Sequence, residues 1–421
     1  MLTEALAAAA LAGTPQSVPP DSAPIVEQTV STRTVTLQDV LRRARTHAPS
    51  AAIAEAQIEL GEAERRAARP LLPDNPSLYV GAGARSNPLG SNVEFQAQLS
   101  QPLEIAGERG ARRRSATARR DALKRAHAAR RWQAEVEARA AFRRALLARQ
   151  RAETAQTAEA FATRVASTTR TLVDAGQESP LRLRLAEAEV ARAAQAHLDA
   201  RYRYRAACND LAKIVGWPLD ERITPKGDLP PPSRPSSASV PDVVQDHVLT
   251  KTAKAEVQAA KAERKAARRD AWPHPTIGAY MATEREPGTP FRSQVGLASI
   301  SIPIPLWRRN QGARARADAQ LRIAEARATV VQRNLARDLD RTRDAVSTAA
   351  DRLSTYTKDV LPRFSDNLAH LQRSFELGEI ELLEVFVARE RFLRLQTQAL
   401  DVYEDYIAAV REYELAAGQP L

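Results

Sequence analysis

Side chains that could carry out chemistry are few and scattered in this sequence. It has one cysteine, Cys208, and six histidines. A single cysteine excludes an intrachain disulfide and a cysteine-based zinc cluster, and the histidines do not have the spacing of metal ligands. We find no nucleophile with a nearby base and no glycine-rich phosphate loop. The sequence therefore does not support an enzyme, and no cofactor is expected.

Charged side chains are abundant, with 27% Asp, Glu, Lys and Arg and a formal net charge of +11. A basic balance of this size could indicate a nucleic-acid-binding protein. However, Arg and Glu alternate through most of the helical stretches, and only 5% of the residues are aromatic and available for base stacking. We therefore expect solvated helix faces and no nucleic-acid partner.

Two glycines mark the predicted ends of helical hairpins. A helical pattern runs into Gly176 and another into Gly378, and each restarts within about five residues on a Leu- and Val-rich face. These glycines are 202 residues apart, as are Gly216 and Gly418 near the ends of the returning helices. An internal repeat of this length indicates a duplicated chain.

The elements that position these glycines follow the same order twice: short helix, β-hairpin, long helix, tip and returning helix. The first repeat is predicted at 35–225, with strands at 77–103, a long helix at 108–175 and the tip at 176. The second is predicted at 242–421, with strands at 276–304, a long helix at 309–377 and the tip at 378. A Pro/Ser-rich linker at 226–241 separates them.

Residues 1–34 are expected to be an export signal and disordered tail; an Ala-rich terminus without a signal explains the start equally well.

The returning helix of the second repeat has an apolar seam. Phe386, Leu393, Leu400 and Ile407 recur every seven residues, although Arg389 and Gln396 interrupt the companion positions. We interpret the seam as a coiled-coil core.

The two hairpins alternate apolar and polar residues, and their strands of about ten residues are long enough to cross a bilayer at a tilt. Four strands cannot close a barrel, and open edges in lipid leave backbone groups unpaired. The strands must therefore be completed by other copies, and three copies would supply about twelve strands. Aromatic residues near the strands could anchor at membrane interfaces or pack in a core: Tyr79, Phe95, Tyr280, Phe291 and Trp307.

From 36 to 421 the chain resembles the TolC-like outer-membrane factor family. Ser100–Arg113 (SQPLEIAGERGARR) and Ile302–Ala313 (IPIPLWRRNQGA) carry the resemblance and are most similar to the CzcC-type cation-efflux branch. The resemblance implies a mainly α fold with a β-barrel part. It implies a homotrimer with a 12-stranded barrel in the outer membrane of a Gram-negative bacterium and a periplasmic α-helical tunnel. It also implies heavy-metal efflux with a periplasmic adaptor (membrane fusion protein), an inner-membrane resistance–nodulation–division pump and contact with outer-membrane lipid.

The resemblance also suggests a periplasmic gate. The family carries an acid six positions after the tip glycine of the second repeat, which is Glu384 here, whereas Val387 stands where a second acid is expected. In the first repeat Arg182 replaces the corresponding acid, so Arg182 and Glu384 are expected to pair and hold the closed state. The alternative is that both are solvated surface residues without consequence.

The tips themselves are expected to contact the adaptor. The residues concerned are Gly176, Gln177, Glu178, Gly378, Glu379 and Ile380. Helix capping alone would also explain the glycines.

For the whole chain, the alternatives are an outer-membrane port for drug efflux or type I protein secretion and, in a different class, a coiled-coil scaffold.

Overall fold

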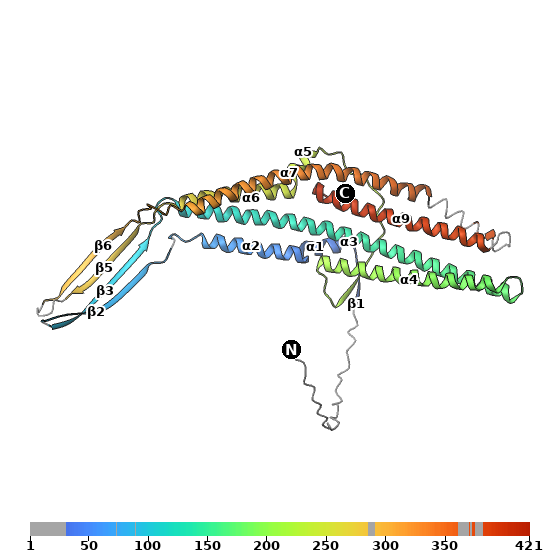
Figure 1. Cartoon of the computed structure of the whole chain (residues 1–421), viewed down its shortest axis with the longest axis horizontal. Coiled ribbons are helices and arrows are strands. Elements are labelled where there is room, and N and C mark those ends of the chain that lie inside the picture. Colours follow the sequence, from blue (N-terminus) through green and yellow to red (C-terminus); the bar gives the residue numbers. More distant parts are fainter. Residues whose placement is uncertain are drawn as a thin grey trace, which may run out of the picture.

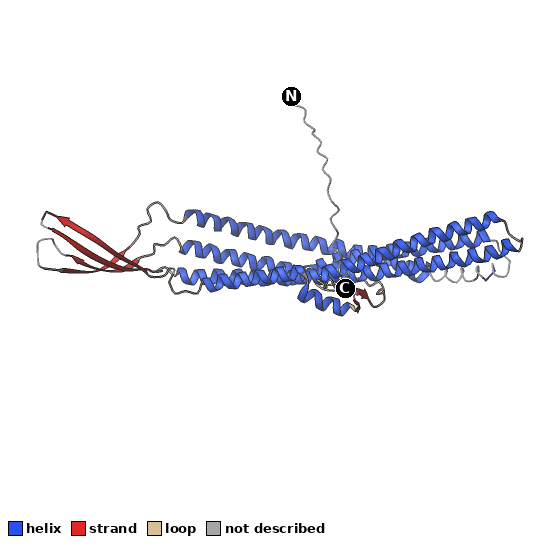
Figure 2. Cartoon of the chain, turned by 90° about the horizontal axis from the view of Figure 1, so that it is seen from below, coloured by secondary structure: helices blue, strands red, loops and turns tan. Residues whose placement is uncertain are grey.

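The computed structural model of the chain describes residues 31–72, 74–88, 90–284, 291–360, 370, 373–374 and 382–421. These residues form a long rod (Figure 1), with a β-sheet at one end and helices along the rest of its length. Figure 2, turned by 90°, shows a similarly narrow outline. None of the described helices is both long enough and apolar enough to cross a bilayer.

The order of elements confirms the predicted duplication. The first repeat contains α1 (Leu37–His47), α2 (Pro49–Ala67), β2 (Ser77–Asn87), β3 (Gly90–Pro102), α3 (Glu108–Asp174) and α4 (Pro180–Val215). The second contains α5 (Val240–Asp246), α6 (Val248–Arg269), β5 (Thr276–Glu284), β6 (Ser293–Ser301), α7 (Gln311–Ser354) and α9 (Leu382–Ala417). At its end α7 continues as a π-helix, Thr355–Val360. Residues 361–369, within the predicted second long helix, lie outside the described part.

Each long helix has two shorter helices laid end to end along it. The 67 residues of α3 span about 100 Å, and α2 and α4 pack against its two halves. In the same way α6 and α9 pack against α7, and both also contact α3 (Figure 1). In the half near the sheet the helices therefore lie in the order α2, α3, α6, α7, which matches the strand order β2, β3, β5, β6.

The returning helices end in the same way in both repeats. Gly216 follows α4 with φ +65°, and a Cβ there would lie 2.3 Å from the carbonyl oxygen of His47. Gly418 follows α9 with φ +69°, and a Cβ there would lie 2.6 Å from Cδ2 of His247. Glycine is needed at both positions because the backbone is left-handed and a side chain would clash. Each return helix is thereby held against the short-helix joint of its own repeat.

The apolar core is concentrated in the middle of the rod. One cluster joins Leu147 of α3 to Leu339 and Val346 of α7 and to Ile407 and Val410 of α9, all of them buried. A second cluster packs α1 and α4 against α3. Ile407 confirms one position of the predicted seam in α9, and the side chain of Phe386 lies outside the described part. A smaller cluster, nearer the sheet, packs Val257 and Ala260 of α6 against Leu321 of α7.

A small parallel sheet was missed by the sequence analysis. β1 (Ser31–Val35) pairs with β4 (Glu221–Pro225), and Val35 and Ile223 are buried in the core of the first repeat. Residues 31–34 were expected to belong to a disordered tail, so this expectation was wrong for them. The sheet could not be predicted because two short strands that are far apart in the sequence leave no local periodic pattern that indicates their pairing.

The Pro/Ser-rich segment between the repeats lies along α9. The Tyr403 hydroxyl donates to the carbonyl oxygen of Pro230, and the Tyr406 hydroxyl accepts from the Ser233 amide at 2.9 Å. α5 then begins at Val240. The segment is therefore fixed by hydrogen bonds to the second repeat instead of serving as a free spacer.

A buried ion pair joins the two repeats at the middle of the rod. Arg139 of α3 donates to Glu414 of α9 at 2.5 Å, and both residues are less than a tenth exposed. The other carboxylate oxygen of Glu414 lies 3.7 Å from Arg143 and accepts the Leu421 amide at 3.3 Å. Nearby, Arg411 of α9 donates to Glu137 of α3. These contacts fix α9, and with it the second repeat, against α3.

Replacing Glu414 with Ala is therefore expected to destabilise the protein. Removing one partner of a buried pair leaves the other charge uncompensated, at a cost of about 3–5 kcal/mol. Glu412→Ala, on the same helix but with a half-exposed carboxylate paired to Arg411, provides the matched control and should cost at most about 1 kcal/mol. Chemical denaturation in detergent would measure both. Equal losses for the two variants would contradict a structural role for the Arg139–Glu414 pair.

Candidate functional site

The four-stranded sheet has one apolar and one polar face. Its register places Val80, Ala97 and Met281 side by side on one face, next to the row that contains Leu78, Leu99 and Ala279. The other face carries the row that contains Gln98 and Tyr280. This alternation is typical of a transmembrane strand with lipid on one side and an aqueous lumen on the other.

The apolar face is uncovered in the single chain. Leu78, Val80 and Met281 are each 69% exposed, and Phe95 on the same face is 57% exposed. An exposed apolar surface of this kind is unusual for a protein in water and indicates contact with another apolar phase. The position of Phe95 agrees with the predicted membrane contact.

The polar face is held together by side-chain hydrogen bonds across the strands. Tyr280 of β5 donates to Gln96 of β3 at 3.2 Å, and Gln96 donates to Tyr79 of β2 at 3.3 Å. Arg85 and Glu94 form an ion pair at 2.6 Å. Tyr79 and Tyr280 therefore lie on the hydrogen-bonded face of the sheet, opposite the exposed apolar residues. Val295 and Leu297 of β6 are apolar exceptions on this face.

The tip of the first repeat is a short, well-defined turn. Gly176 has φ +71°, its amide donates to the carbonyl of Val173, and the Gln177 amide donates to the carbonyl of Leu172. These two bonds form a Schellman motif, which ends α3. Pro180 then occupies the first turn of α4. Gly176 and Gln177 are exposed and Glu178 is half-buried at the end of the rod, where a partner could reach them.

Arg182 is tied to this tip. Its guanidinium donates to Glu178 at 2.6 Å, one helical turn earlier. In the second repeat Glu384 and Val387 are both exposed, close to the start of α9. Gly378, Glu379 and Ile380 lie outside the described residues. The predicted pairing of Arg182 with Glu384 therefore stays a prediction.

Arg389 is a residue near the tip that the sequence analysis did not identify as part of a site. Its guanidinium carbon lies 4.9 Å from the ring centre of Phe161 on α3 and 5.6 Å from that of Phe392. Burial, and to a smaller extent the nearby Arg164, lower the pKa of Arg389. The sequence did contain a sign that Arg389 is unusual, because position 389 interrupts the apolar seam. The side chain holds α9 to α3 by cation–π contacts.

No group of three His, Cys, Asp or Glu side chains within the described ranges is arranged to hold a metal ion. The chemical features that the structure does present are a sheet with two different faces and a long helical body that ends in a narrow tip. Such a body can enclose a passage only when its edges are joined to other copies.

Comparisons with known proteins agree with this architecture. The sequence profile of the outer membrane efflux protein family matches residues 40–217 and 247–419, which lie in both repeats. The cobalt-zinc-cadmium resistance protein CzcC of Cupriavidus metallidurans is 24% identical over 307 residues, covering 73% of this chain and 72% of that protein.

Solved structures share the fold at low sequence identity. CusC superimposes with a TM-score of 0.72 at 16% identity, covering 91% of this chain and 92% of CusC. VceC of Vibrio cholerae gives a TM-score of 0.69 at 17% identity, with 91% and 96% covered. The open state of the MtrE outer membrane channel of Neisseria gonorrhoeae gives 0.69 at 17% identity, with 91% and 89% covered. Because the profile matches most of the sequence in both repeats, the chain belongs to the outer membrane efflux protein family, which is a family of channels and not of enzymes.

Proposed function

We propose that three copies of this chain form an outer-membrane conduit that exports heavy-metal cations together with a periplasmic adaptor and an inner-membrane pump. The open sheet carries this proposal. β2 and β6 each pair on one side only within the described residues, and the sheet has an apolar and a polar face. Joining β6 of one copy to β2 of the next would pair both edges, place the apolar face toward lipid and enclose the polar face.

Exposed apolar residues on the edge helices support the same assembly. Near the sheet, α2 and α7 are the outer helices of the layer, and each exposes two apolar residues seven positions apart: Ile53 and Leu60 on α2, and Ile323 and Val330 on α7. A spacing of seven is typical of helices that pack along each other. α7 of one copy would therefore pack against α2 of the next, in the part of the helical body that adjoins the joined strands.

Toward the tip, α4 takes the place of α2 at this edge. It exposes Leu181, Leu185, Leu198 and Tyr202, which no described part of the same chain covers. The matching edge of the next copy would bury them. A closed ring of identical copies would thus pair the open strand edges and bury these exposed apolar residues.

The similarity to CzcC, whose name refers to cobalt, zinc and cadmium resistance, favours divalent cations as the cargo. A strain that lacks this chain should therefore become several-fold more sensitive to these cations, and the intact gene should restore resistance. Susceptibility to metals and to organic drugs, together with the amount of secreted protein, would be measured in the same strains. Unchanged metal tolerance with increased drug sensitivity, or with lost secretion, would instead indicate a port for drug efflux or type I secretion.

The gate is proposed to lie near the tips, at Glu384 and Val387 of the second repeat and Arg182 of the first. Three symmetry-related copies would bring three carboxylates and three apolar side chains into narrow rings, which attract cations and resist water. The tips, including Gly176, Gln177 and Glu178 and the undescribed Gly378, Glu379 and Ile380, would receive the adaptor. An exposed Arg182–Glu384 pair would contribute at most about 1 kcal/mol, so a partner could open it readily.

Single-channel recordings in lipid bilayers test this gate. Arg182→Ala and Glu384→Ala should each raise the ratio of open to closed channels by up to about fivefold for each ion pair removed, and so by up to about a hundredfold for the three pairs of a trimer. Glu384→Ala should also lower the preference for cations. Glu390→Ala, which removes an exposed carboxylate paired to Arg394 on the same helix, is the matched control and should change neither property. If both gate variants behave like the control, these residues do not form the gate.

A further inference from the structure

The junction between the helices and the sheet is rich in exposed arginine. All four helices that reach the junction contribute exposed arginines at or next to their ends. Six of these define what we call the junction collar: Arg69, Arg113, Arg268, Arg269, Arg308 and Arg314. If the sheet lies in the outer membrane, the collar lies at the surface of that membrane.

Carboxylates at the junction neutralise these cations only in part. Glu104 is engaged by Arg112, and Asp318 is shared by Arg264 at 2.6 Å and Arg268 at 3.5 Å. Arg269 instead donates to a backbone carbonyl, that of Ala106, at 3.0 Å. Arg113, Arg308 and Arg314 form no ion pair with any side chain that the structure describes. The collar therefore has an excess of positive charge facing solvent.

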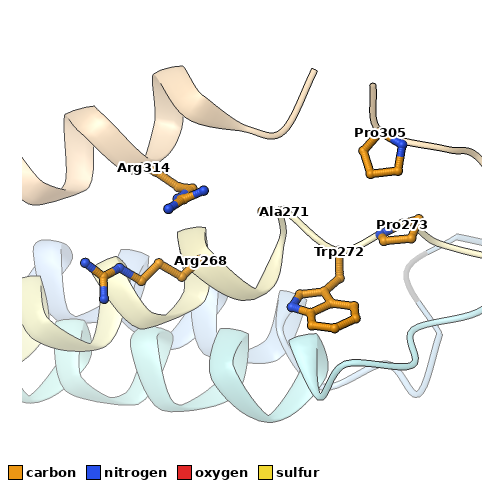
Figure 3. Close-up of a pocket in the computed structure, with 6 residues that line it drawn as sticks. All are labelled: Arg268, Ala271, Trp272, Pro273, Pro305 and Arg314. Atoms are coloured by element: carbon orange, nitrogen blue, oxygen red, sulfur yellow. The ribbon is translucent and has the colours of Figure 1, made fainter. Parts of the chain in front are cut away.

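A hollow between α6 and α7 gives part of the collar a defined shape. It is lined by Arg268, Ala271, Trp272, Pro273, Pro305 and Arg314, and no acidic side chain is among these residues. Figure 3 shows Arg314 projecting from α7 toward α6, which carries Arg268, while Trp272 and Pro273 follow the end of α6. Guanidinium groups suit phosphate oxygens, and an indole ring suits the boundary between head groups and acyl chains.

Exposed apolar residues lie between the sheet and this hollow. Ile300 ends the apolar face of β6, and Ile302, Ile304, Leu306 and Trp307 continue toward α7, all exposed. Apolar and aromatic side chains next to a cluster of arginines are typical of a surface that meets anionic lipid. The apolar run would reach the acyl chains while the arginines reach the phosphates.

We propose that the junction collar binds the head groups of anionic phospholipids in the leaflet next to the helices, with one head group seated between Arg268 and Arg314 in each chain. The proposal rests on the outer-membrane position of the sheet and does not depend on the exported compound. Binding here would fix the depth of the sheet in the bilayer.

Native mass spectrometry of the protein extracted from the outer membrane tests this site. The protein should retain phosphatidylglycerol in preference to phosphatidylcholine when the two are titrated at equal concentration. Arg314→Gln should weaken phosphatidylglycerol binding by about fivefold, the usual effect of one Arg near an anionic surface, and adding Arg268→Gln should weaken it further. Inorganic phosphate should not displace the lipid, because it cannot use the apolar flank.

Arg337→Gln is the matched control. It removes the same charge from an exposed position of α7 about 35 Å along the helix from Arg314, and it should leave lipid binding unchanged. Equal binding of the two lipids, an equal effect of the control, or no effect of the double substitution would each overturn the proposal. The same spectra report the mass of the assembly, so failure of the trimer is distinguished from failure of the lipid site.

Discussion

The unpaired edges of the four-stranded sheet are the constraint on which the rest of the structure depends. In lipid, each unpaired amide or carbonyl costs several kcal/mol, so β2 and β6 cannot remain open. The helices repeat the same arrangement, because α2 and then α4 form one edge of the body while α7 lies at the other. In the proposed assembly the whole chain is one sector of a ring, and its exposed apolar residues lie where neighbouring sectors would meet.

Within one sector the two repeats must be held together as a single stiff body. α3 contacts helices of both repeats, Arg139 and Glu414 form a buried ion pair between α3 and α9, and the segment around Ser233 is bonded to Tyr406. A single layer of helices has solvent on both sides for much of its length. This explains why a chain with so few aromatic residues and so many charged ones can still form an ordered rod.

Much of this fold could be predicted from the sequence because its main signals are local. The period of two in the strands, the glycines at the tips and the offset of 202 residues predicted the duplicated order of elements. Contacts between distant segments were not predictable in this way, including the β1–β4 pair and the position of Arg389 between two phenylalanine rings. The face of the sheet on which Tyr79 lies was not predictable either. A tyrosine side chain can contact lipid, but it can also accept a hydrogen bond, as Tyr79 does from Gln96. At the candidate gate, Arg182, Glu384 and Val387 came from family resemblance, and one chain alone cannot show how copies arrange them.

The most direct test of the central claim is the size of the protein extracted from the outer-membrane fraction, compared on unboiled and boiled SDS gels. Closure of the sheet by three copies predicts a species near three times 46.2 kDa that dissociates on boiling. A single band near 46.2 kDa in both samples, from a protein recovered in the soluble fraction, would contradict the trimeric barrel and leave the helical rod without a membrane role.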